Sequence, residues 1–586
     1  MAQLPPNLRF KFVLVNGIWL DESKPYMNTT MKPFATELQT LREKGVRWTH
    51  PKTKVVCTTH VTAPSFCADA PARAQLQNIL SSWKDFHPQQ PVVPGEEKKS
   101  RRRVYTFEES IVLRTSDRME QQGLERRRFQ LESGRKPKPV KEVKGPSVLS
   151  KFPGCDRSTA VFPEYMHLIL CLLKEFMTLW FERDGPWSFK EHRDAINESL
   201  KRISVPDFVT RIPRSTEHYS KWKANEFRSF LLYFSPIILS KYMKVEYFQH
   251  WLLLVASFYL LLQECVPESD VTKANLMLSH SDSTQSKCSF DVSLHFQGLI
   301  LFLNEVELLA CRGPTLRVFC RSFPVLYKQE FYTYYVHQLC HLPLTVQRHG
   351  PLHCNSAFMF ESFNGTLAKF IHGTKNQGKE LVNNIRIAFG VEALRARTLY
   401  CSTTNQPLTV ELRNEIRNFN FSEEDVNLLH SLKTPVKPFY RAIIRRESFT
   451  CSLYTRQKKR NNFTICYSSS SSGGKAYRRV LRTKSDLSDL VERRAYRSDF
   501  VLRTRRYGEI KYFCSSDDRH LAIVERLDLD HCNTFLHEDS GVVIKHIIPI
   551  KLSTVTEIIQ LDQILCKVIR VKNFICLRPN TYEYNL

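Results

Sequence analysis

The sequence predicts a mixed fold, with an α/β opening, a large helical domain and a small β-rich domain at the C-terminus. The chain has 586 residues, and at roughly 150 residues per domain this length allows about four domains. Apolar residues make up 42% of the chain, and 38 Phe, 22 Tyr and 7 Trp supply large core side chains, so we expect a folded protein. The spacing of apolar residues changes along the chain from strand-like to helical and back, which sets the order of the domains.

The opening unit, residues 1–82, carries signals for both strands and helices. Residues 8–20 alternate like a strand, and their apolar run is broken by Asn16 without a small-residue cleavage site after it, so we do not interpret it as a signal peptide. Residues 33–44 have helical spacing that ends at Gly45, and residues 46–63 resemble a β-hairpin. Residues 83–152 are rich in proline and charge, which indicates an exposed, basic connecting segment.

Long apolar runs with helical periodicity predict a helical domain over residues 153–330. The most apolar run, Trp251 to Leu262, is shorter than the roughly 20 residues needed to span a bilayer, so we expect a buried helix. Residues 331–396 form a second helical segment with polar interruptions, and residues 397–435 are interpreted as a linker. Short β-branched runs between turns predict a β-rich domain over residues 436–586.

The charge balance favours a polyanionic partner. The chain has 85 Lys and Arg against 59 Asp and Glu, a net charge of +26, and residues 441–511 alone hold 19 basic and 6 acidic residues. That region is either a DNA contact or only a soluble face. Seventeen scattered cysteines favour a reducing compartment over a disulfide framework. The candidate DNA contacts are Arg101, Arg102, Arg103, Arg126, Arg127, Arg128, Lys458, Lys459, Arg460, Arg478, Arg479, Arg505 and Arg506.

Common enzyme signatures are absent from the sequence, which contains no Gly-rich phosphate loop, GxSxG, HExxH or CxxC. Asp69 stands directly before a predicted helix with proline in its first turn, a position typical of a helix cap. Glu164 and His167 are three residues apart and would share a helix face, where a satisfied core histidine is the simplest interpretation.

Two further features have the residue types of a metal or catalytic site. His337 and His341 have the i, i+4 spacing that can hold one metal ion, although two histidines do not complete a site. Glu361 lies in the apolar stretch FMFESF, where burying an unpaired carboxylate would be costly.

Six sequence blocks resemble successive blocks of animal CACTA (En/Spm-type) transposases, and they occur in the family's order. They are residues 24–51, 67–78, 143–153, 164–170, 211–233 and 336–374. The resemblance covers roughly residues 8–395 and reaches the remainder only loosely, through RRYGEIKYF and similar fragments. It implies a transposase of nuclear location that acts on DNA, commonly as a homodimer.

The family implies an RNase H-like fold interrupted by a large helical insertion. Residues 1–82 would be part of the RNase H-like core, 153–330 the insertion and 331–396 the segment that completes the core. The family's chemistry uses three carboxylates that hold two Mg²⁺ ions for phosphodiester cleavage and strand transfer. Asp69 resembles the second of these acids and Glu361 the third, with Glu226 as the alternative third acid.

The remaining correspondences bring departures from the family. His337 and His341 resemble the histidine half of a structural Zn²⁺ site, but the family's CxxC is replaced by residues 81–97, which leaves the site incomplete. Glu164 and His167 fall on the [Cys/Asp]xxHis block, with Glu where the family has Asp or Cys. The first catalytic acid would lie in an Asp-Gly motif upstream of these blocks. We therefore expect a transposon-derived DNA-binding protein that cannot cleave DNA alone. The alternatives are an active transposase whose first acid is supplied from elsewhere, and a structural or protein-interaction remnant.

Overall fold

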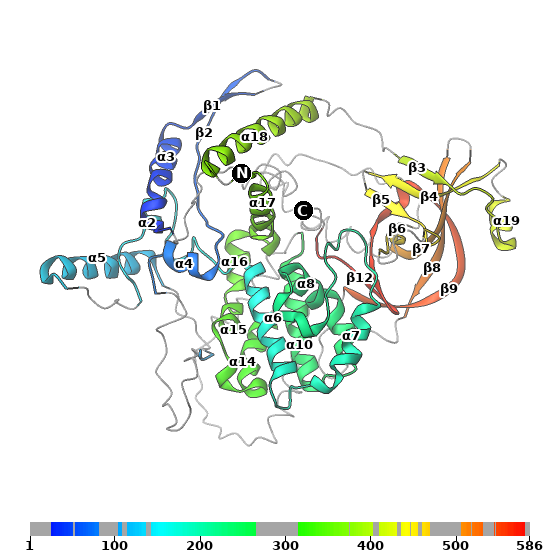
Figure 1. Cartoon of the computed structure of the whole chain (residues 1–586), viewed down its shortest axis with the longest axis horizontal. Coiled ribbons are helices and arrows are strands. Elements are labelled where there is room, and N and C mark those ends of the chain that lie inside the picture. The colour runs from blue at the N-terminus through cyan, green and yellow to red at the C-terminus, as the bar shows by residue number, and fades with distance from the viewer. Residues whose placement is uncertain are drawn as a thin grey trace, which may run out of the picture.

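The structure is a computed structural model of mixed helix and sheet, in which N-terminal elements, a central helical bundle and a curled antiparallel sheet follow one another (Figure 1). It describes residues 25–50, 53–80, 104–107, 114–135, 142–264, 315–373, 375–401, 410–430, 435–445, 447–454, 460–468, 505–516, 519–530, 544 and 546–580. The predicted strand at residues 8–20 lies outside these residues.

The N-terminal lobe, defined as residues 25–80, 114–135 and 142–161, confirms the predicted helix and hairpin. Its elements are α2 (Met27–Thr30), α3 (Lys32–Glu43), β1 (Val46–Thr49), β2 (Val56–Thr59), α4 (Ala70–Leu76), α5 (Ser116–Ser133) and the 3-10 helix η1 (Val148–Lys151). Helix α3 packs Ala35 and Leu38 against Val148 and Phe152 of the segment around η1. A parallel bridge between Phe66 and Val161 joins the segment before α4 to the C-terminal end of the lobe.

Within residues 83–152, predicted to be an exposed connector, the structure describes a largely exposed helix, α5, and a buried stretch around η1. Helix α5 begins after Thr115, whose hydroxyl accepts from the Arg118 amide, and ends at Gly134 in the left-handed conformation. Val143 and Leu149 are fully buried. A side chain at Gly123 would lie 2.7 Å from the Gly145 carbonyl carbon, so α5 packs closely on the following segment. The many proline and charged residues of this segment make its few buried apolar residues difficult to recognise from the sequence.

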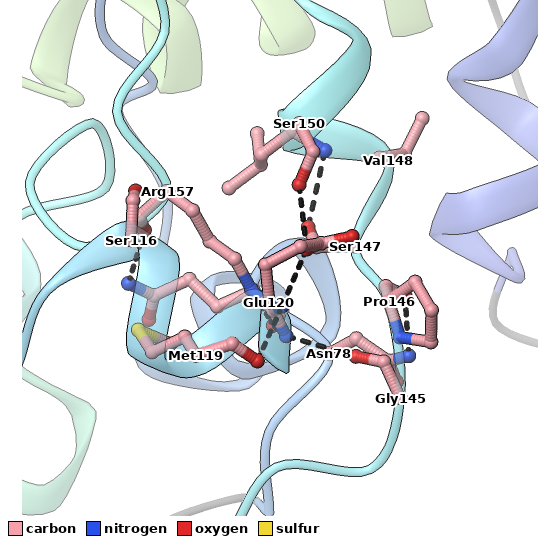
Figure 2. Close-up of polar contacts among 12 residues, drawn as sticks. Asn78, Ser116, Met119, Glu120, Gly145, Pro146, Ser147, Val148, Ser150 and Arg157 are labelled. Carbon is pink, nitrogen blue, oxygen red and sulfur yellow. Dashed lines mark hydrogen bonds and ion pairs between the residues drawn. The ribbon is translucent and has the colours of Figure 1, made fainter. Parts of the chain in front are cut away.

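A buried guanidinium holds the lobe together. Arg157 is 1% exposed and donates to the backbone carbonyls of Gln77, Met119 and Gly145, at distances from 2.6 to 3.1 Å. It also pairs with Glu120 at 3.0 Å (Figure 2). Arg157 therefore ties the C-terminal end of α4 to α5 and to the segment before η1.

The helices predicted over residues 153–330 are confirmed where the structure describes them, and the bundle that they form extends to Leu339. Its helices are α6 (Tyr165–Glu182), α7 (Arg193–Lys201), α8 (Ala224–Ser229), the π-helix η4 (Phe230–Phe234), α9 (Ser235–Leu239), α10 (Val245–Leu261), α14 (Thr315–Tyr327) and α15 (Tyr334–Leu339), with 3-10 turns η2 (Lys190–His192), η3 (Thr216–Lys221) and η6 (Gln329–Phe331). Trp180 of α6 and Trp251 of α10 are fully buried and meet edge to face at 4.8 Å. Helix α10 is thus the buried helix expected from its apolar run. Among the helices of the described part, none combines the length and apolar composition of a membrane span.

Four further elements continue from the bundle toward the N-terminal lobe. They are α16 (Leu342–His349), η7 (Leu352–Asn355), α17 (Phe358–Ala368) and α18 (Gln377–Cys401). Figure 1 shows α17 and α18 above the bundle, next to the lobe. His349 binds the Thr159 carbonyl through Nε2 at 3.2 Å, and its ring packs on Phe162, so α16 is joined directly to the lobe.

The described residues of the C-terminal region form a ten-stranded antiparallel sheet with the central order β10-β6-β7-β8-β9-β12-β11. The strands are β3 (Val410–Glu415), β4 (Lys437–Ile444), β5 (Glu447–Thr450), β6 (Thr464–Ser468), β7 (Arg505–Ser516), β8 (Arg519–Leu529), β9 (Ile547–Gln560), β10 (Ile564–Lys567), β11 (Ile569–Val571) and β12 (Phe574–Cys576), with 3-10 turn η8 (Leu561–Gln563). Register shifts in the β7–β8 and β8–β9 pairs accompany the curl of the sheet. The predicted linker 397–435 contributes β3, which pairs with β4, and α19 (Glu423–Leu429), so this part of the linker prediction is wrong.

The sheet docks on the helical bundle through buried polar contacts. His546 is 1% exposed, stacks on Tyr259 at 3.8 Å and binds the Leu232 carbonyl at 2.9 Å. Leu232 lies in the π-helix η4, whose altered hydrogen-bond pattern presents carbonyl groups to the sheet. Lys567 pairs with Asp207 at 2.7 Å.

Candidate functional site

Asp69 caps helix α4. Its Oδ1 accepts a hydrogen bond from the Ala72 amide at 2.8 Å, and Pro71 lies in the first turn, so the helix-cap interpretation is confirmed. Cys67, two residues earlier, donates its thiol to the Asn355 carbonyl at 3.2 Å. This contact holds the start of α4 beside the segment that leads into α17.

Glu164 is buried at the N-terminus of α6 and uses both carboxylate oxygens. Oε1 accepts from the amides of Met166 and Ala357, each at 2.9 Å. Oε2 accepts from the His167 amide at 3.0 Å and contacts His167 Nδ1 at 2.7 Å. Glu164 is therefore the N-cap of the helix, and through Ala357 it also anchors the start of α17. As the sequence predicts, Glu164 and His167 lie next to each other at the start of this helix.

The charges of the predicted acids Asp69 and Glu361 both act on His167. Burial lowers the pKa of its imidazole, but the hydrogen bond and charge of Glu164, together with the charges of Asp69 and Glu361, outweigh burial and leave the pKa above its ordinary value. The structure thus brings Asp69 and Glu361, which are distant in sequence, into the electrostatic surroundings of one imidazole.

Glu361 lies in the first turn of α17 and is exposed, although its neighbours in the sequence are apolar. Other residues of α17 make its packing contacts. Phe358 packs on Tyr165, and the Arg228 guanidinium lies 4.6 Å above the Phe358 ring. An exposed carboxylate carries no burial penalty, so Glu361 can face solvent or a ligand without a fixed partner.

Glu226, the alternative third acid, has a structural role. It is 2% exposed, forms a two-point ion pair with Arg214 at 2.8 and 2.9 Å, and accepts from the Lys223 amide at 2.8 Å. These bonds fix the start of α8 and leave the carboxylate no free face for metal binding.

His337 and His341 face each other in a partly buried pair. Their Nε2 atoms are 3.3 Å apart, close to the separation of two imidazole nitrogens on one tetrahedral zinc ion, about 3.3 Å for Zn–N bonds of about 2.0–2.1 Å. The surroundings do not fit such a site. Burial, together with the nearby His337 and Arg73, lowers the pKa of His341 to about 3 and keeps this imidazole neutral. Arg73 adds a fixed positive charge and bonds Gln338 at 2.9 Å, while Tyr105 stacks on His337.

The described residues hold no group of three or more His, Cys, Asp or Glu side chains arranged to bind a metal ion. For Mg²⁺, the relevant carboxylates are those of Asp69, Glu164 and Glu361. Asp69 Oδ1 and both oxygens of Glu164 are committed to backbone and imidazole donors. Glu361 is the exposed member of the three.

The predicted DNA-contacting residues have different environments. In α5, Arg127 and Arg128 are exposed and Arg126 is half-buried. The Arg460 guanidinium donates hydrogen bonds to the carbonyls of Pro206 and Val209, and Arg506 pairs with Glu557 at 2.6 Å. Arg505 is half-buried at the start of β7. The remaining candidates lie outside the described residues: Arg101, Arg102, Arg103, Lys458, Lys459, Arg478 and Arg479.

Sequence reasoning missed Arg73 and Tyr105. Arg73 lies one turn after Asp69, on the same short helix, and reaches α15 through Gln338. Its position one turn after a candidate acid is a signal that could have been used. Tyr105 gives no such signal, because its contact with His337 joins segments that are far apart in sequence.

Comparisons of the chain with protein families, with curated proteins and with solved structures found no match. The assignment of function therefore depends on the chemistry of the site and on the sequence resemblance.

Proposed function

We propose that this chain is a transposon-derived DNA-binding protein that resembles CACTA transposases and does not cleave DNA on its own. The observation that carries the proposal is that the Cys67 thiol bonds to the Asn355 carbonyl and the Ala357 amide to the Glu164 carboxylate, which holds the start of α4, with Asp69, near the start of α17, with Glu361. The resemblance requires these two acids, from opposite sides of the helical domain, to share one site. An RNase H-like core, here a proposal as well, is supported by the parallel bridge Phe66–Val161, which lies just before α4.

The bonding of the acids favours binding over cleavage. Two-metal cleavage needs carboxylate oxygens that are free to hold cations in fixed positions. Glu164 accepts four hydrogen bonds, and Asp69 uses one oxygen as a helix cap. Burial lowers the pKa of His167, but Glu164, Asp69 and Glu361 together raise it above its ordinary value, so these acids already interact with the chain's own imidazole.

The charge of the chain supports DNA as the partner, since its net charge of +26 attracts a polyanion. The test measures binding of the full chain to a fluorescein-labelled 30-base-pair duplex by fluorescence anisotropy, from 50 to 200 mM KCl, with and without Mg²⁺. We expect binding that weakens steeply with salt and is indifferent to Mg²⁺. No retention of DNA at 50 mM KCl would contradict the proposal and favour a structural or protein-interaction role.

The active-transposase alternative is tested on the same duplex with Mg²⁺ or Mn²⁺. Asp69→Asn is the informative variant because asparagine caps helices as well as aspartate does but lacks the charge. Metal-dependent nicking that Asp69→Asn abolishes would establish cleavage and overturn the proposal. We expect no nicking by either protein, and equal DNA binding by both.

A further inference from the structure

The hairpin β1–β2 is an exposed two-stranded ribbon. Val46 pairs with Thr59 and Trp48 with Cys57, and every residue of β1 is exposed. Trp48 is 42% exposed and Val56 is 57% exposed. Because these two residues lie on opposite faces of the ribbon, both faces are open to solvent. Figure 1 shows the hairpin extending away from α3 at the edge of the molecule.

The base of the hairpin is fixed on α3. The Gly45 and Val61 amides both donate to the Leu41 carbonyl, and His60 Nδ1 contacts the Arg42 carbonyl at 2.6 Å. Gly45 has φ +71°, and a side chain there would lie 2.5 Å from the Thr58 methyl group, so only glycine fits. The ribbon is thus held in a defined direction by its base, while its own faces pack on little.

An isolated two-stranded ribbon is marginally stable in water, which makes an exposed one with valines and a tryptophan on its surface a place for a partner. The sequence identifies the chemistry of that partner. Residues 44–68 contain four Lys and Arg and no Asp or Glu. In the described part of the chain, Lys44, Arg47 and Lys54 take part in no ion pair. Their charge is available to an external anion.

The dimensions of the ribbon favour a DNA duplex over other anionic partners. The major groove is about 12 Å wide and admits a two-stranded β-ribbon, with phosphates on both walls for cations at the ribbon's edges. Trp48 is held by a 2.8 Å hydrogen bond from its indole N–H to the Thr59 hydroxyl, so its ring is a rigid apolar surface. A membrane surface would instead favour one apolar face and one polar face, and here both faces carry apolar side chains.

We propose that the hairpin β1–β2 is a DNA-contacting ribbon that enters a groove of the duplex, with Arg47 and Lys54 on the phosphates. The inference rests on the proposed DNA-binding function and names the element that makes the contact. It adds a contact surface that is separate from the acidic site at His167.

The experiment compares the full chain with the double variant Arg47→Gln/Lys54→Gln in the anisotropy assay described above. The matched control is Lys241→Gln/Lys244→Gln, two exposed lysines at the start of α10 on the helical bundle. Glutamine removes the charge without cutting a core contact, and circular dichroism checks that both variants keep the wild-type fold. Each phosphate contact contributes about 0.9 to the slope of log K against log salt, so losing two should lower the slope by about 1.8 and weaken binding at 100 mM KCl roughly 50-fold.

The outcomes separate the two proposals. Loss of slope and affinity in the hairpin variant alone supports the ribbon. Equal binding by the wild type and both variants overturns the ribbon and leaves DNA binding intact, with another surface as its site. A wild type that does not bind DNA overturns both proposals. If the hairpin variant instead loses only its binding to phosphatidylserine vesicles, the partner is a membrane surface and the ribbon proposal is wrong.

Discussion

Replacement of Arg157 should unfold the N-terminal lobe locally. The Arg157→Met variant keeps much of the side-chain volume but leaves the carbonyls of Gln77, Met119 and Gly145 without their donor. Hydrogen bonds to a charged group contribute about 1.5–3 kcal/mol each, and breaking a buried ionic network by removing one partner costs about 3–5 kcal/mol. We expect a loss of about 3–5 kcal/mol in total, because all these bonds come from one side chain and their partner Glu120 is partly solvent-exposed. Arg157→Lys keeps the charge but has a single ammonium, so we expect a smaller loss, about half as large.

Hydrogen exchange measures this loss where it occurs. The Leu80 amide donates to the Glu142 carbonyl and the Lys144 amide to the Asn78 carbonyl, so both report on the contact that Arg157 supports. A loss of 3–5 kcal/mol corresponds to exchange roughly 100- to 3000-fold faster at these amides, at about 1.4 kcal/mol per tenfold change. Peptides from α10 serve as the internal control and should not change. Exchange within fivefold of wild type in Arg157→Met would refute the role assigned to this side chain.

Two further predictions concern titration. Burial lowers the pKa of His546 to about 3, so the folded state holds it neutral while the unfolded state protonates it near pH 6.5. Its contribution to stability is therefore full above pH 6.5 and is lost as the pH falls toward 3, by up to about 1.4 kcal/mol per pH unit. Melting temperatures from pH 8 to 5 should fall less steeply in His546→Gln, and equal slopes would contradict this assignment. In Glu164→Gln, His167 loses its charged partner while burial remains, so its pKa should fall, as measured by NMR titration of the imidazole. An unchanged pKa would mean that Glu164 does not control the ring.

Local signals predicted local structure well. The helix at residues 33–44, the hairpin after it and the buried helix α10 all follow from the spacing of apolar residues over one or two turns. Strand β3 was missed because VELRNE is polar at most positions, and it becomes a strand only through its pairing with β4. An edge strand such as β3 has few buried positions, so its sequence lacks the apolar alternation that identifies a strand.

The candidate site was predictable in its residue types and only partly in its geometry. The cap at Asp69 follows from its position before a proline-containing helix, and this required no family knowledge. Glu361 lies in the apolar stretch FMFESF and is nevertheless exposed, because this stretch turns its apolar side chains to different sides of α17. The role of Arg157 had no signal at all, since its acceptors are backbone carbonyls of three separate segments.

These features connect the stability of the lobe to the site. Helix α4 carries Asp69 at its first end, and at its other end the Gln77 carbonyl is held by Arg157. Arg73, in the middle, bonds Gln338 of α15. If Arg157 is the main support of α4, Arg157→Met should move Asp69 away from His167 and lower the pKa of His167, although Arg157 does not touch the imidazole. If the bond between Arg73 and Gln338 suffices, the pKa stays where it is while exchange at Leu80 and Lys144 still rises. The same variant therefore shows whether Asp69 is held in place by the N-terminal lobe, through Arg157, or by the helical domain, through Gln338.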